Sequence, residues 1–131
     1  MSLVIQVAQY ILSKRPLLTT MGLERLVFFS QCRHYALYGS LLYPEKSYKR
    51  HTSPVSYELM ALQEGKYLAK IEDIGMYAGG LKTQEKESCG WVLANFGGGL
   101  WKECIEWGLT GQGEEVSMED IKRIANIFIQ I

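Results

Sequence analysis

The stretch TTMGLERLVFFSQ, residues 19–31, carries a helix start followed by an apolar run that contains two adjacent phenylalanines. Thr19 or Thr20 can cap the helix, and Gly39 can close it as a C-cap residue. Residues of one helical face then recur at the spacing of an α-helix. They are Leu23, Leu26, Val27, Ser30, His34 and Leu37. Because Phe28 and Phe29 widen that face, the sequence predicts a helix that is apolar on most sides and lies at the centre of a bundle.

A second amphipathic helix is expected before this stretch, over residues 2–15. Its apolar positions follow the i, i+4, i+7 rule and end at Pro16, which cannot continue a helix. They are Val4, Ile5, Ala8, Ile11 and Leu12. The sequence of the N-terminal third of the chain therefore predicts two helices that pack against each other.

After Gly39 the pattern weakens. Residues 40–52 are predicted to be irregular or weakly extended, and Ser53-Pro54 is expected to start a third helix that ends near Gly65. Residues 66–82 are expected to be a connector, with a short helical turn over 71–74.

The C-terminal half predicts three more helices. Thr83 is expected to cap the first, which the run Gly97–Gly99 ends; a short helix follows over residues 100–108, and then a loop containing Gly111 and Gly113. Ser117 and Asp120 have the spacing of a capping box for a final helix. The predicted fold class is all-α. Residues 1–131 are expected to form one domain, a bundle of about six helices, in which a short segment near 42–52 is irregular or β.

Composition limits the function classes. The chain has 14 basic and 14 acidic residues, so it lacks the broad positive field of non-specific nucleic-acid binding, and a nucleic-acid partner is not expected. Three widely spaced cysteines, with no N-terminal signal pattern, favour free thiols and a cytoplasmic location. No apolar run is long enough for a membrane helix, so no membrane association is expected.

Motifs for catalysis or metal binding are missing from the sequence. No set of Cys, His and acidic residues has metal-ligand spacing, and there is no nucleophile elbow, HExxH or P-loop. His34 lies mid-helix on an apolar face, which favours a packed side chain. We therefore expect no enzyme activity, no catalytic residue, no metal and no cofactor.

One basic and aromatic cluster occurs, formed by Lys46, Lys49, Arg50 and His51 with Tyr43 and Tyr48 interleaved. A solvated loop, a protein-binding edge and a nucleic-acid contact are all compatible with this composition. Irregular segments on a rigid bundle are frequent recognition sites. We therefore take Tyr48, Arg50, His51 and Tyr57 as candidate partner-binding residues.

Residues 19–57 resemble the Panacea domain family, which includes SocA-like antitoxins and phage-associated proteins. The matching residues are Thr20, Met21, Leu23, Leu26, Val27, Phe28, Phe29, Ser30 and Gln31. The sequence LYPE at 42–45 follows in the expected place, and SPV at 53–55 with Tyr57 stands where the family has Gly-Pro-Val and a tyrosine. Fainter similarity continues through LQEGKYLAKIEDI, TQEKESCGWVLANFG and GEEVSMEDIKR.

The chain also departs from this family. Gly22-Leu23-Glu24-Arg25 replaces a typical Lys-Leu-Gln-Lys, and residues 48–51 replace an Ala-Trp pair. The family's Thr-His segment is missing, and LWKEC at 100–104 stands in its place.

The resemblance implies a compact helical domain that neutralises a protein partner by binding it, as an antitoxin binds its cognate toxin. It brings no catalytic residues. The alternative, which the missing Thr-His segment favours, is a phage- or mobile-element-encoded inhibitor of a host defence or other host protein on the same scaffold. The oligomeric state stays open, a homodimer included.

Overall fold

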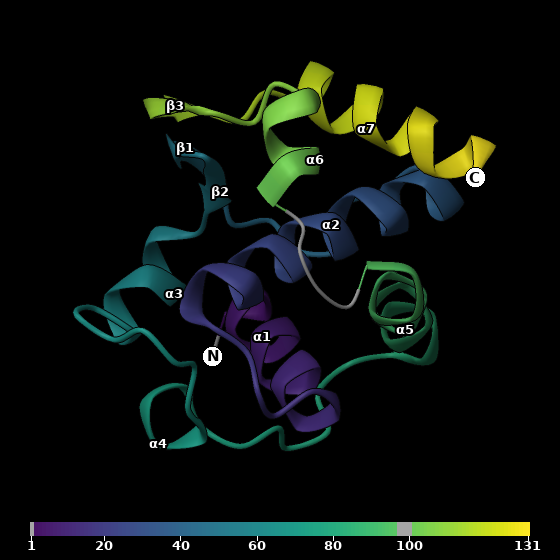
Figure 1. Ribbon diagram of the computed structural model, residues 1–131. Helices are drawn as coiled ribbons and strands as arrows, with labels where there is room; N and C mark the ends of the chain where they lie inside the picture. Colours follow the sequence, from purple (N-terminus) through teal and green to yellow (C-terminus); the bar gives the residue numbers. More distant parts are fainter. Residues whose placement is uncertain (1, 97–100) are drawn as a thin grey trace.

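The computed structural model describes residues 2–96 and 101–131. Helix α2, Thr20–Tyr38, runs through the middle of the molecule (Figure 1). Its N-cap is Thr19, whose side chain accepts a hydrogen bond of 2.9 Å from the Gly22 N–H. Gly39 ends the helix in the left-handed region, with φ 67°. Both predicted caps are therefore confirmed.

The three other long helices pack against α2. They are α1 (Leu3–Lys14), α5 (Thr83–Phe96) and α7 (Met118–Gln130). Figure 1 shows α1 on one side of α2 and α7 on the other. The apolar positions expected for the first helix are all buried, and the Ser117–Asp120 capping box of α7 is present in both directions. These predictions are confirmed.

The central position of α2 follows from its composition. Ten of its residues are buried, among them Phe28, Phe29 and His34. The predicted position Leu37 is an exception, since it is 46% exposed. It lies in the last turn of α2, and the prediction that it belongs to the buried face is wrong.

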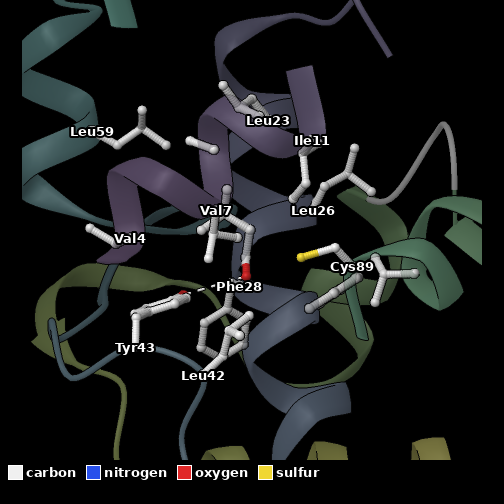
Figure 2. Packing of buried hydrophobic residues seen from close by; sticks show 14 of the residues in the cluster. Val4, Val7, Ile11, Leu23, Leu26, Phe28, Leu42, Tyr43, Leu59 and Cys89 are labelled. Carbon is white, nitrogen blue, oxygen red and sulfur yellow. Dashed lines mark hydrogen bonds between the residues drawn. The ribbon is translucent and has the colours of Figure 1, made fainter. Parts of the chain in front are cut away.

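One contiguous core joins the helices to the segment that follows α2. Figure 2 shows Val4, Val7 and Ile11 of α1 packed with residues of α2 and with Leu59, Leu42 and Tyr43. The Tyr43 hydroxyl donates a long hydrogen bond of 3.5 Å to the Val27 carbonyl. Tyr43 is only 1% exposed, so its assignment to the basic and aromatic surface cluster is wrong.

A small antiparallel sheet is the main departure from an all-α fold. It contains β1 (Tyr48–His51), β2 (Ser53–Val55) and β3 (Gly111–Glu115), in the order β2-β1-β3. Tyr48 pairs with Val55 on one side and with Glu115 on the other. The expected loop at 111–115 is therefore a strand, because its backbone groups pair with β1, a contact between segments about sixty residues apart. The fold is mainly helical, with seven helices among the described residues.

The predicted helix start at Ser53-Pro54 is wrong. Both residues belong to β2. Helix α3, Tyr57–Leu62, begins after this strand, and Ser56 is its N-cap. Since β2 is an edge strand, the missing N–H of Pro54 leaves no hydrogen bond unmade within the sheet.

The remaining elements are short. Helix α4, Ile71–Ile74, confirms the predicted turn in the connector, and α6 spans Trp101–Glu106. Thr83, expected as a cap, is the first residue of α5. The predicted break at Gly97–Gly99 lies outside the described residues.

Candidate functional site

The four candidate residues come from one continuous segment, which runs from β1 through the hairpin to α3. The rings of Tyr48 and Tyr57 stack face to face, with centroids 4.2 Å apart and planes 5° from parallel. Because Tyr48 pairs with Val55, Tyr57 lies two residues beyond its partner and begins α3 beside it. The stack is therefore one contact between α3 and the sheet.

Arg50 and His51 end strand β1 and are exposed. The Arg50 guanidinium contacts the Met60 sulfur of α3. The His51 N–H donates to Gln112 Oε1 of β3 at 3.2 Å. His51 has φ 54°, the one positive φ outside glycine among the residues that the structure describes. Such backbone is uncommon for a histidine, and it turns the chain sharply beside Arg50.

A pocket of about 550 Å³ opens between the start of α2, helix α3 and the turn that follows it. Arg50, His51 and Tyr57 line it, whereas Tyr48 supports it from behind through the stack on Tyr57. A second hollow of about 380 Å³ shares Arg50, His51 and Tyr57 and adds Lys49 and Gln112. The structure thus brings three of the four predicted residues to one pocket.

Glu24 of α2 also lines this pocket, and sequence reasoning missed it. It is only 3% exposed. Its Oε1 accepts a hydrogen bond of 3.0 Å from the Ser56 N–H, and its Oε2 has no partner. Burial raises the pKa of Glu24 to about 8, although the Ser56 hydrogen bond acts in the opposite direction. The carboxyl group is therefore largely protonated and uncharged at neutral pH.

A second buried polar residue, Gln63, follows α3 and lines the same pocket. It is 4% exposed, and neither atom of its side-chain amide has a hydrogen-bond partner. The signal for Glu24 was present in the sequence, since an acid occurs in a helix that is apolar on most sides. The sequence contained no comparable indication that Gln63 would be buried, because it stands just after the end of α3, outside any helical pattern.

Exposed aromatic and charged groups surround the pocket opening. Tyr57 is 45% exposed and Tyr67 is 77% exposed. Lys66 and Glu64 are also exposed and line the pocket. Since Glu24 is largely uncharged, Arg50 and Lys66 outweigh Glu64, and the pocket carries a positive excess.

The rest of the described chain offers little reactive chemistry. Cys32, Cys89 and Cys104 are free and buried, and burial raises the pKa of all three thiols. His34 Nδ1 lies 2.8 Å from the Ser88 hydroxyl, and burial lowers the pKa of that imidazole. Over residues 2–96 and 101–131, no cluster of three His, Cys, Asp or Glu side chains is arranged to hold a metal ion. No helix in the described part of the chain combines the length and apolarity needed to cross a membrane.

Comparison of the chain with protein-family models, with curated proteins and with solved structures finds no match. These comparisons assign the chain to no family, and the function must be argued from the pocket and its surroundings.

Proposed function

We propose that this protein is an antitoxin-like protein-binding module without catalytic activity, which recognises its partner through the face around the pocket. The observation that carries the proposal is that two exposed tyrosines, Tyr57 on α3 and Tyr67 after it, line the pocket. Four exposed apolar or aromatic side chains occur in this part of the sequence. They are Tyr57, Leu62, Tyr67 and Leu68. Exposed apolar groups beside a pocket, with a charged rim, are typical of protein interfaces, where tyrosine and arginine supply much of the binding energy.

The face is held in place before any partner binds. The Thr20 N–H donates to the Tyr67 carbonyl at 2.9 Å, and the Ala69 N–H donates to the Leu18 carbonyl at 2.9 Å. The Thr20 hydroxyl adds a hydrogen bond of 3.1 Å to the Lys66 carbonyl. These contacts tie the segment to the start of α2, so less conformational entropy is lost on binding.

The burial and the raised pKa values of the cysteine thiols support the part of this proposal that excludes catalysis by a cysteine nucleophile. A nucleophilic cysteine needs an exposed thiol of lowered pKa, whereas the three thiols here are buried with raised pKa values. The family resemblance makes a cognate toxin the first candidate partner, and a host protein targeted by a phage or mobile element the second.

The test is affinity capture of the tagged protein from its native host, with the neighbouring genes expressed, read by mass spectrometry. We expect one stoichiometric protein that is lost in the Arg50→Ala, Tyr57→Ala double variant. The matched control is Lys122→Ala on α7, which removes an exposed cation outside the pocket. A partner encoded next to this gene supports the antitoxin role, and one encoded elsewhere supports the inhibitor role. Capture that is unchanged by the double variant, or no partner at all, would contradict the proposal.

A further inference from the structure

The apolar lining of the pocket comes from one face of α3 and from the segments beside it. Tyr57, Met60 and Ala61 follow the i, i+3, i+4 spacing of a helix, so they share the side of α3 that lines the pocket. Met21 of α2 and Tyr67 of the turn after α3 line it as well. Both methionines are partly exposed. Because methionine is flexible and polarizable, this lining can adapt to an inserted apolar group.

Two cations line the same pocket without an acidic partner. Arg50 and Lys66 are exposed, and neither forms an ion pair within the part of the chain that the structure describes. Glu64 is the one ionised acid among the described residues of the lining, since the buried Glu24 is largely protonated at neutral pH. The two cations are therefore available to carboxylates of a partner, whereas a basic partner would be repelled.

The position of Arg50 indicates where such a carboxylate would stand. The Arg50 Nη1 donates to the Met60 sulfur, so the guanidinium lies against the apolar lining. A guanidinium has five N–H donors, and this one contact leaves most of them for a carboxylate. A carboxylate bound at Arg50 would therefore lie close to an apolar side chain in the pocket. The matching ligand has an acidic residue next to an apolar one.

We propose that the pocket binds a short acidic segment of the partner protein that carries one aromatic or large aliphatic side chain. The apolar side chain lies against Tyr57, Met60 and Tyr67. Carboxylates that flank it pair with Arg50 and Lys66. The volume of about 550 Å³ suits one large side chain with its adjoining backbone. This inference rests on the proposed protein-binding function and specifies the chemistry of the partner.

The first experiment measures binding of fluorescein-labelled peptides of about nine residues to the purified full chain by fluorescence polarisation. Each probe has a central phenylalanine, leucine or tryptophan, with glutamates on both sides of it. We expect at least one probe to bind with a Kd below about 100 µM, and several-fold more weakly when salt rises from about 0.05 M to about 0.5 M. Control peptides with a central alanine, or with lysines in place of the glutamates, should bind at least about 10-fold more weakly.

Charge reversal tests the assignment of the two cations. The Arg50→Glu, Lys66→Glu double variant should bind the acidic peptide at least about 10-fold more weakly and should gain binding of the lysine peptide. The Lys82→Glu, Lys122→Glu double variant is the matched control, because it changes the net charge equally at exposed positions outside the pocket. Tyr67→Ala, at a position that is 77% exposed, should weaken the acidic peptide and leave the melting temperature unchanged.

Three results would overturn the inference. One is no binding of any acidic probe at about 1 mM. Another is equal affinity for the peptide with a central alanine, or for a single-stranded oligonucleotide, which would show a general attraction of anions. The third is an equal loss of acidic-peptide binding in both charge-reversal variants.

The peptide result and the capture result are separable. A captured partner that depends on Arg50 and Tyr57, with no peptide binding, would reject the acidic segment and leave the proposed function standing. Peptide binding by the pocket with no captured partner would reject the antitoxin-like function, and the pocket would still be assigned to acidic segments.

Discussion

Tyr48 and Tyr57 stack with their ring centroids 4.2 Å apart, and this contact joins the first strand of the sheet to the start of α3. The stack supports one wall of the pocket, because Tyr57 lines it and Tyr48 lies behind. A helix of six residues has little stability of its own, so its position depends on such contacts.

Removing either ring of this stack should lower the free energy of unfolding, and the two effects should not add. We expect Tyr48→Ala and Tyr57→Ala to show a coupling of about 0.5–1.5 kcal/mol in a double-mutant cycle, as measured for aromatic pairs. Urea unfolding of the two single variants and the double variant measures it. Strict additivity would show that the rings do not stabilise each other.

Arg50→Ala should separate binding from folding. The side chain is exposed, so the free energy of unfolding should change by no more than about 0.5 kcal/mol. If Arg50 is an interface hot spot, affinity for the captured partner should fall at least about 10-fold. Surface plasmon resonance measures this against Lys122→Ala, and equal affinities would remove Arg50 from the partner-binding site.

Leu26→Ala tests the central position of α2. Leu26 is 1% exposed within the core, so its truncation should cost roughly 2–5 kcal/mol of unfolding free energy. Leu17 is 89% exposed, and Leu17→Ala, measured by the same denaturant titration, should cost less than about 0.5 kcal/mol. A similar small loss for both variants would contradict the packing of α2.

Glu24 should make the protein less stable as the pH rises. Its pKa is raised from 4.5 to about 8 in the folded protein, so between these values the folded state holds a proton that the unfolded state has lost. The free energy of unfolding should therefore fall by roughly 1.4 kcal/mol per pH unit over that window on account of Glu24 alone.

Glu24→Gln removes this titration and keeps an oxygen that can accept from the Ser56 N–H. Urea unfolding of both proteins at several pH values between 5 and 8 isolates the effect, because contributions such as that of His34 cancel in the difference. Parallel stability curves would show that Glu24 ionises at its ordinary pKa.

Two of the buried glutamines, Gln31 and Gln63, should respond oppositely to substitution by leucine. Gln31 Oε1 accepts from the N–H groups of Leu42 and Tyr43, at 2.6 and 3.1 Å, and its Nε2 donates to the Tyr43 carbonyl at 2.9 Å. Gln31→Leu leaves three buried backbone groups unpaired and should cost about 3 kcal/mol or more. Gln63→Leu leaves none and should not destabilise. Thermal and urea unfolding of both variants compares them, and an equal loss would mean that Gln63 has partners of its own.

Features that depend on residues close together in the chain were predicted correctly from the sequence. The Thr19 and Gly39 caps, the amphipathic face of α1 and the capping box at Ser117 depend on residues within a few positions of each other. The four candidate residues Tyr48, Arg50, His51 and Tyr57 lie in one hairpin segment because they are close along the chain, and their role in partner binding stays a prediction. The pocket that Arg50, His51 and Tyr57 line could not be predicted in this way, because its other walls come from α2 and from residues 63–67.

The sequence by itself determined the helices apart from the start of α3, because helical periodicity and caps act over a few residues. It also determined that the apolar stretch at 19–31 would be central. Only the tertiary structure decided the sheet, since β3 forms by pairing with a strand distant in sequence, and this pairing made strands of residues that read as a helix start and a loop. Only the tertiary structure also decided the state of Glu24, because the surroundings that desolvate a side chain, and so raise its pKa, come from the whole fold.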